Sequence, residues 1–95
     1  MAAYAIVDVE IYDIEAFLHY QKQLAPLLEQ AGARYLARGG EFRVYAGDYE
    51  PGRLIVLEFP SLRTMDAFYE SEAYQQLTSL REASSECRIL AVEGL

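Results

Sequence analysis

Three carboxylates and two arginines are the side chains of this 95-residue sequence whose types and spacing best suit chemistry. Asp8 and Glu10 alternate with apolar residues in the first extended segment, and Glu58 does the same near the end of a later one. Arg34 and Arg38 lie in one short extended segment at a spacing that puts them on the same face of a strand. If these faces coincide, acids and arginines meet on one surface, where buried charges must pair or line a wet cavity.

This charged set predicts a small-molecule site. Arg38, beside the flexible Gly39-Gly40, would orient an anionic or carbonyl ligand, and Glu58 would act as a base or an orienting carboxylate with a shifted pKa. The alternative is structural, with the same charges forming ion pairs that fix the register between strands or between subunits. The sequence leaves open whether Arg38 and Glu58 touch.

A second group of candidate ligand-binding residues comes from the predicted helices. Tyr74 and Arg81 share one side of a helix, and together with Tyr69 they are placed to gate a pocket between sheet and helices. Gln21 interrupts an apolar helical stripe and therefore has to find polar partners inside. Ordinary packing, with the rings inward and the hydroxyls in water, is the competing interpretation.

The remaining reactive side chains predict no chemistry. His19, the only histidine, falls nearly opposite the apolar stripe of its helix and is expected in solvent. Cys87, the only cysteine, has no histidine within sequence reach and is expected to be a buried bystander. One histidine and one cysteine do not match the spacing of a metal site, so neither a metal nor another cofactor is expected.

Hydrophobic patterning predicts the elements that position these side chains. Asp13, Ser61 and Ser71 are expected to cap helices, and Pro26 is expected to kink or loosen the first helix. The stripe that this helix buries is predicted to include Ile14, Phe17, Leu18, Gln21 and Leu24. The predicted strands are Ala3–Tyr12, Ala33–Arg38, Arg53–Phe59 and Cys87–Glu93, with 42–49 extending the second as a glycine-interrupted hairpin, and the predicted helices run from 14 to about 30 and onward from 62 and from 72.

The element order strand–helix–strand–strand–helix–strand predicts the ferredoxin-like α+β fold, an antiparallel sheet with its helices on one face. The whole chain, residues 1–95, is expected to be a single domain. A chain this short buries only about 60–65% of its unfolded surface, and the helix-free face of the sheet must also be covered. A second copy, packed sheet to sheet in a two-fold homodimer, is the simplest cover.

The composition limits the kinds of partner that this chain is expected to bind. The formal net charge of −7 argues against binding to nucleic acid or to an anionic membrane, since both need a basic surface. No apolar run approaches the roughly 18 residues of a membrane span, and the first residues do not resemble a signal peptide. A single cysteine cannot form an internal disulfide, which favours a reducing cytoplasm.

Several sequence blocks together resemble the DUF1330 family over nearly the whole chain. The blocks are Tyr35–Gly40, Glu58–Ser61, Tyr69–Gln75, Arg81 and Val92–Gly94. The resemblance implies a dimeric α+β barrel, a superfamily that also holds small monooxygenases, muconolactone isomerases and haem-degrading enzymes. It implies no reaction, because the family is named for an unknown function.

The sequence departs from the family pattern at two places. Many members carry Gly-Gly before the tyrosine of the second strand and a tryptophan in the second helix. This chain has Gly32-Ala33-Arg34 and Phe68 at those places, so a pocket shaped by that tryptophan need not be the same here.

Two functions remain open on these observations. The first is a metal-free small-molecule enzyme that acts by proton transfer or cofactor-independent oxygenation in a cavity lined by Arg38 and Glu58. The second is a non-catalytic ligand-binding or accessory protein. An enzyme needs a base with a shifted pKa that opens onto the cavity, whereas a binder needs only a shaped apolar pocket and an anchor such as Arg38.

Overall fold

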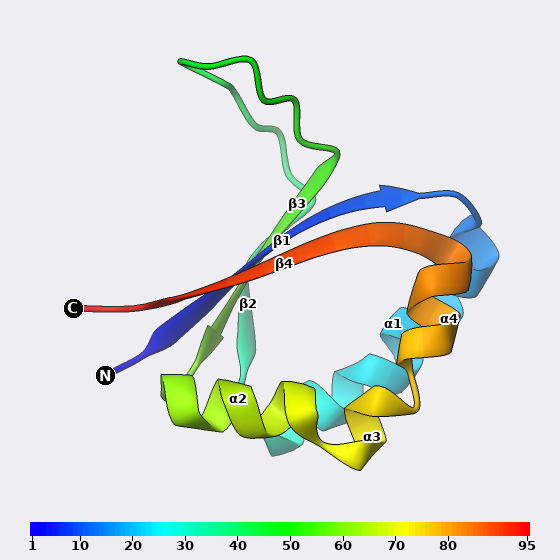
Figure 1. Cartoon of the computed structure of the whole chain (residues 1–95), viewed down its shortest axis with the longest axis vertical. Coiled ribbons are helices and arrows are strands. Elements are labelled where there is room, and N and C mark those ends of the chain that lie inside the picture. The colour runs from blue at the N-terminus through cyan, green and yellow to red at the C-terminus, as the bar shows by residue number, and fades with distance from the viewer.

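Four strands and four helices make up the chain, and the computed structural model describes all of residues 1–95 (Figure 1). In order they are β1 (Ala3–Ile11), α1 (Ile14–Gln30), β2 (Arg34–Arg38), β3 (Arg53–Phe59), α2 (Leu62–Glu70), α3 (Glu72–Gln75), α4 (Thr78–Ser84) and β4 (Ser85–Glu93). The predicted ferredoxin-like order is confirmed, with the second helical region divided into three short helices. No helix is both long enough and apolar enough to cross a membrane.

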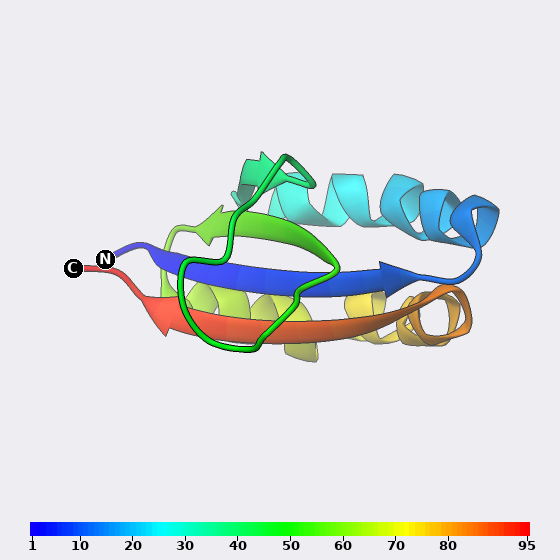
Figure 2. The same ribbon diagram turned by 90° about the horizontal axis from the view of Figure 1, so that it is seen from above.

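The strands form one antiparallel sheet in the order β2-β3-β1-β4. Figure 1 shows this sheet nearly edge-on, with every helix on one side of it, and Figure 2 shows the strands side by side with the helices behind them. The face toward the helices is called the helix face below, and the other is called the open face. The prediction that all helices cover one face is confirmed.

The three predicted N-caps are confirmed. Asp13 Oδ1 accepts a hydrogen bond from the Ala16 amide at 3.2 Å and so begins α1. Ser61 and Ser71 cap α2 and α3 in the same way. Because each cap satisfies an amide that the first helical turn leaves free, the helices start where the sequence places them.

Helix α1 continues through Pro26 as one helix of 17 residues, so the kink or loosening predicted at this proline does not break the helix. Proline removes the hydrogen bond to the carbonyl four residues earlier, which belongs to Lys22. Both Pro26 and Lys22 are exposed, so water can satisfy that carbonyl. The buried face of α1 also differs from the predicted one. Ile14 and Leu18 are exposed, whereas the helix buries Phe17, Tyr20, Leu24 and Leu28.

The core lies between α1, the later helices and the helix face. Alternate residues of β1 and β3 point into it, as the period of two predicts. The most completely buried large side chains are Phe59 of β3 and Met65 of α2. The buried apolar residues of the two central strands are Ala3, Ala5, Val7, Val9, Ile55, Leu57 and Phe59.

The segment after β2 differs from the predicted hairpin. No strand forms between Arg38 and Arg53. The last ladder bond runs from the Gly39 amide to the Leu54 carbonyl at 2.7 Å. Gly39 then turns the chain away with φ of 71°, and the Arg53 side chain fills the space where a Cβ would lie.

The C-terminal half also differs in its boundaries. Helix α4 reaches Ser84 and β4 begins at Ser85, two residues before the predicted strand start at Cys87, so no linker separates the two elements. Both serines are buried, and both hydroxyls donate to the Arg81 carbonyl at the helix end. The serines therefore satisfy the end of α4 and allow the chain to enter the sheet directly.

Candidate functional site

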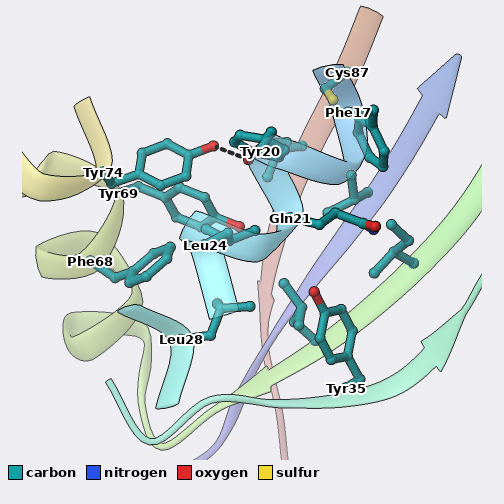
Figure 3. A pocket seen from close by; sticks show the side chains of 14 residues that line it. Phe17, Tyr20, Gln21, Leu24, Leu28, Tyr35, Phe68, Tyr69, Tyr74 and Cys87 are labelled. Atoms are coloured by element: carbon teal, nitrogen blue, oxygen red, sulfur yellow. Dashed lines mark hydrogen bonds between the residues drawn. The ribbon is translucent and has the colours of Figure 1, made fainter. Parts of the chain in front are cut away.

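A hollow between the sheet and the helices is the principal pocket of the chain (Figure 3). Its enclosed part measures about 40 Å³, room for a few waters. With its mouth and the adjoining open solvent included, the space free of atoms is about 450 Å³. The lining residues are Val7, Phe17, Tyr20, Gln21, Leu24, Leu28, Tyr35, Ile55, Leu57, Phe68, Tyr69, Tyr74, Cys87 and Ile89.

Packed aromatic rings form one wall of this pocket. Tyr69 meets Phe68 and Tyr74 edge to face, with ring centroids 5.0 Å apart in both pairs. Phe59 lies behind them, 5.3 Å from Phe68. Edge-to-face pairs of this kind add packing energy beyond burial, so the wall is held in one arrangement by its own rings.

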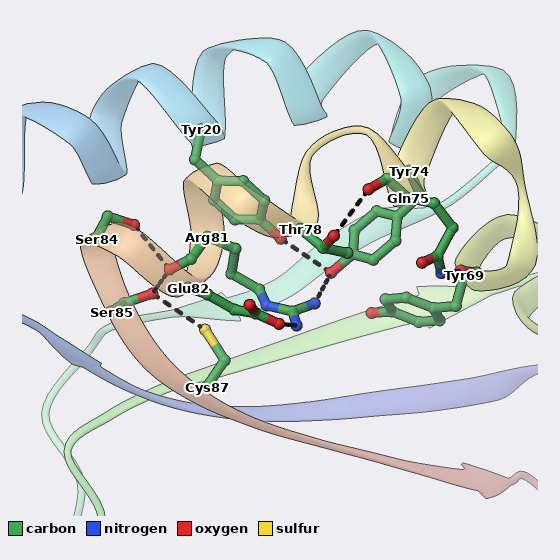
Figure 4. A network of polar contacts seen from close by, with 10 residues as sticks. All are labelled: Tyr20, Tyr69, Tyr74, Gln75, Thr78, Arg81, Glu82, Ser84, Ser85 and Cys87. Atoms are coloured by element: carbon green, nitrogen blue, oxygen red, sulfur yellow. Dashed lines mark hydrogen bonds and ion pairs between the residues drawn. The ribbon is translucent and has the colours of Figure 1, made fainter.

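Polar groups from three helices meet at one end of the pocket (Figure 4). The hydroxyls of Tyr20 on α1 and Tyr74 on α3 lie 3.1 Å apart. Arg81 on α4 donates from Nη1 to the Tyr74 hydroxyl at 2.8 Å. Tyr74 accepts from the guanidinium, and either tyrosine hydroxyl can donate to the other, so one of the two hydroxyl protons has no partner within this chain.

The surroundings raise the pKa values of Tyr20, Tyr69 and Arg81. Burial raises the pKa of Tyr20 well above its ordinary value, and the neighbouring Tyr74 raises it further. Burial likewise raises the pKa of Tyr69, with Tyr74 as the next cause. Burial, the largest single cause, lowers the pKa of the Arg81 guanidinium, but the hydrogen bond to Tyr74 and the charges of Tyr74, Tyr20 and Cys87 together outweigh it, and the net shift is upward. The pocket end therefore holds hydrogen-bond donors and a cation.

The charge of Arg81 has only a weak counter-ion. The one carboxylate in contact is Glu82, whose oxygen lies 3.6 Å from Nη2 and whose side chain is 72% exposed, against 20% for Arg81. No aspartate or glutamate lines the pocket. A mostly buried cation without a buried partner creates a positive potential, which favours an electron-rich oxygen at this end.

The predicted ligand-binding residues come together here. Tyr69, Tyr74 and Gln21 line the pocket, and Arg81 contacts it through Tyr74. Gln21 is half-buried and finds no side-chain partner in the chain, contrary to the expectation that it would. Because no fully buried side-chain nitrogen or oxygen lacks a hydrogen bond, its amide keeps contact with solvent. The binding role of these residues stays a prediction.

Arg38 and Glu58 are not brought together. A bulge between Tyr35 and Ala37 shifts the register of β2, so Arg34 faces Glu58, whereas Arg38 faces Ile55 on the helix face. The predicted shared face of the two arginines is therefore wrong, because one extra residue reverses the alternation. Arg34 Nε lies 2.7 Å from Glu58 Oε1, and the Arg38 guanidinium lies 4.6 Å from the centre of the Tyr35 ring.

The other polar candidates have simpler surroundings. Asp8 holds the end of the segment after β2, because it accepts hydrogen bonds from the Gly52 amide at 2.8 Å and from the Tyr49 hydroxyl. His19 is exposed as predicted and contacts Gln23. Cys87 is half-buried at the pocket wall, with its sulfur 3.5 Å from the Ser85 hydroxyl. No group of three or more potential metal-ligating side chains is found.

Sequence reasoning missed Tyr20 and Tyr35. Tyr20 follows Phe17 by three residues and precedes Leu24 by four, so helical spacing from these two would have placed it inside. Tyr35 alternates with Arg34 and Leu36 on an edge strand, and nothing in that short run indicates which face is covered.

Fold and pocket together define a small α+β protein with an apolar hollow between a four-stranded antiparallel sheet and its helices. The model of the family described as a domain of unknown function, DUF1330, matches residues 2–95. The chain therefore belongs to the DUF1330 family. None of the curated proteins matches this sequence.

Solved structures of similar fold are known. A protein of unknown function from Rhodopseudomonas palustris is 18% identical, with a TM-score of 0.78 over 99% of this chain and 82% of that one. A protein from Jannaschia, described as dimeric and ferredoxin-like, is 16% identical, with a TM-score of 0.70 over 99% and 100%. SnoaB, a cofactor-independent oxygenase from Streptomyces nogalater, is 7% identical, with a TM-score of 0.66 over 99% and 93%. These similarities establish the fold.

Proposed function

We propose that this chain is a cytoplasmic homodimer that binds an apolar small molecule between sheet and helices, with an acceptor oxygen of the ligand held at the Tyr20–Tyr74–Arg81 end. The observation that carries the proposal is the hydrogen-bonded group of Arg81, Tyr74 and Tyr20, set at the end of an otherwise apolar pocket. The apolar walls favour a ring-bearing ligand, and the donors favour a carbonyl, enolate or phenolate oxygen on it.

The reaction class in this proposal is metal-free chemistry at a carbon next to that oxygen. Stabilising an enolate lowers the barrier to removing the neighbouring C–H proton. In cofactor-independent oxygenation, a CH₂ group and O₂ become C=O and H₂O, with the substrate supplying the electrons. The fold shared with SnoaB is compatible with this class.

Arg38 and Glu58, which the sequence analysis placed in one site, have separate roles in this proposal. Arg38, on the Tyr35 side of β2, orients the ligand at the mouth of the pocket. Glu58, paired with Arg34 on the other face, maintains the sheet and its contact with a second copy. Neither assignment requires the two residues to meet.

A non-catalytic binding protein is the second candidate. It is favoured by one observation: no aspartate, glutamate, lysine or histidine lines the pocket, so no ordinary general base is at hand. A binder needs only the apolar walls and the donors at one end.

Paired probes test the binding site. Isothermal titration with 1-naphthol and with naphthalene compares two ligands of similar shape, of which only the first carries an oxygen. We expect tighter binding of 1-naphthol, and a loss of about tenfold in that preference in Tyr74→Phe, the size of one hydrogen bond. Tyr12→Phe, which changes an exposed tyrosine, is the matched control. Equal binding of the two probes by the wild type would contradict the proposed site.

A ketone with acidic C–H protons, used as a test substrate, distinguishes the candidate enzyme from the candidate non-catalytic binding protein. We expect the C1 protons of 2-tetralone, monitored by NMR in D₂O, to exchange faster with the protein than in buffer, and an oxygen electrode reports any O₂ consumption. Binding with exchange no faster than in buffer would support the non-catalytic candidate.

A further inference from the structure

Residues 39–52, which connect β2 to β3, stand away from the body of the molecule and are called the arm. Figure 1 shows the arm rising from the side of the sheet opposite the helices, and in Figure 2 it passes in front of β1 and β4. Every residue from Gly40 to Glu50 is exposed. The arm therefore extends over the open face rather than over the pocket.

The base of the arm is fixed to the sheet. Gly39 is still bonded to Leu54 at one end, and Asp8 of β1 accepts from the Gly52 amide and the Tyr49 hydroxyl at the other. The hydrogen bond to Asp8 is the main cause that raises the pKa of Tyr49. These contacts fix the direction in which the arm leaves the sheet.

Beyond its base, the arm has little to support it within the chain. No backbone amide from Gly40 to Glu50 donates to another backbone group. Ordering such a segment costs conformational entropy that hydrogen bonds and burial normally offset. The missing contacts point to a surface outside this chain.

The arm also exposes apolar side chains toward a concave inner side. Phe42, Val44 and Tyr49 line a hollow of about 720 Å³ within the curve of the arm. Tyr45 is 92% exposed at its outer part. Exposed aromatic residues grouped in this way are typical of an interface.

The apolar surface continues from the arm onto the open face. A second hollow, of about 430 Å³, lies between Tyr49 and the sheet, with Ile6, Leu54 and Leu90 on its walls. Val92 extends the exposed apolar surface along β4. The arm and the open face thus form one concave surface on the side away from the helices, in which apolar side chains lie beside charged ones such as Asp8, Glu50 and Arg88.

We propose that the arm clasps a second copy of this chain, with Phe42, Val44 and Tyr45 packed against the partner. The inference rests on the homodimer of the proposed function. A sheet of the same shape, placed on the open face by a two-fold axis, would bring its own arm to the first chain, so both arms and both apolar faces are covered by one operation. A net charge of −7, with Arg43 as the only cation between Gly40 and Gly52, disfavours a nucleic acid or an anionic membrane as the occupant.

Sedimentation equilibrium of the full-length protein tests the arm. The triple variant Phe42→Ser/Val44→Ser/Tyr45→Ser removes the arm's apolar side chains and leaves the Asp8 contacts in place. We expect the dimer Kd to rise at least tenfold, with circular dichroism unchanged. Leu18→Ser, on the exposed side of α1, is the matched control and should leave Kd within twofold of the wild type.

Two outcomes separate the arm from the dimer itself. A wild-type dimer whose Kd is unchanged in the triple variant overturns the arm's role and leaves the homodimer intact. A wild type that is folded and monomeric at about 100 μM overturns both. Hydrogen exchange gives a second measurement: amides 41–49 should exchange more slowly at concentrations that favour the dimer, and equal rates in dimer and monomer would contradict the clasp.

Discussion

The two faces of the same four-stranded sheet differ in what covers them. On the helix face, Leu57 and Phe59 are buried against helices of their own chain. On the open face, residues of the strands β1 and β4 include Ile6, Leu90 and Val92, which are 37%, 65% and 52% exposed. Alternation of side chains along a strand gives one chain two surfaces, and here one forms a core and a pocket while the other is left for a partner.

Residues of the helix face and of the open face are expected to contribute to different properties of the protein. Residues of the helix face stabilise the fold within a single chain and shape the hollow that would hold a ligand. Residues of the open face are less buried within the single chain, and in the proposed dimer they would act through association. Substitutions on the two faces should therefore respond differently to protein concentration.

The largest effect is expected on the helix face. Leu57→Ala removes a side chain that is 4% exposed, and a cavity of this kind costs about 2–5 kcal/mol of the free energy of unfolding. Urea unfolding measures it, and the loss should be the same at low and high protein concentration. A loss that disappears at high concentration would mean that Leu57 acts through the dimer.

A charge on the open face should act almost entirely on association. Leu90→Asp places a carboxylate in the apolar surface that a second copy would cover, and we expect the dimer Kd to rise about 100-fold, because a buried unpaired charge is costly. Analytical ultracentrifugation measures this, with Leu18→Asp as the control for a new charge at an exposed leucine. A variant that unfolds as a monomer would show that the open face also supports the single chain.

High pH should lower the free energy of unfolding through the buried tyrosines of the pocket. The folded-state pKa values of Tyr20 and Tyr69 are raised, so their contribution is complete below the unfolded pKa near 10 and is lost as pH rises above it. The free energy of unfolding should fall by up to about 1.4 kcal/mol per pH unit for each of the two tyrosines. Urea unfolding from pH 8 to 11 measures the slope, and Tyr20→Phe should make it shallower. An equal slope in that variant would place the effect elsewhere.

The smallest effect is expected for the ion pair on the open face. Arg34→Ala breaks the contact with Glu58, in which the arginine side chain is 70% exposed. Exposed pairs contribute about 1 kcal/mol or less, so the midpoint of urea unfolding should barely change. A large loss only where the dimer forms would show that a second copy buries the pair.

Much of this arrangement could be predicted from the sequence, because the alternation of side chains along a strand and the capping of a helix depend only on residues close in the sequence. Alternation in β1 indicated which side faces the helices, and Asp13, Ser61 and Ser71 marked the helix starts. Helical spacing also predicted Tyr69 and Tyr74 beside a pocket between sheet and helices, and both line the hollow there; Gln21, singled out separately because it interrupts an apolar stripe, lines the same hollow. Local rules are sufficient where each residue's neighbours are set by its own element.

The failures arose where register is set by distant residues. The bulge in β2 depends on how the edge strand pairs with β3, and it moved Arg38 to the face opposite Glu58. The extended pattern of 42–49 suggested a strand, but Gly39 turns the chain out of the sheet before pairing can continue. Side-chain alternation cannot show whether a partner strand is present.

The position of the pocket on the helix face has a consequence for ligand binding in the proposed dimer. With the open faces together, the two pockets lie on opposite outer sides, and two sheets, packed about 10 Å apart, stand between them. A ligand in one subunit then touches no side chain that borders the other pocket. Two molecules should therefore bind per dimer with the same affinity and a Hill coefficient of one, so that occupancy reports ligand concentration over a broad, graded range.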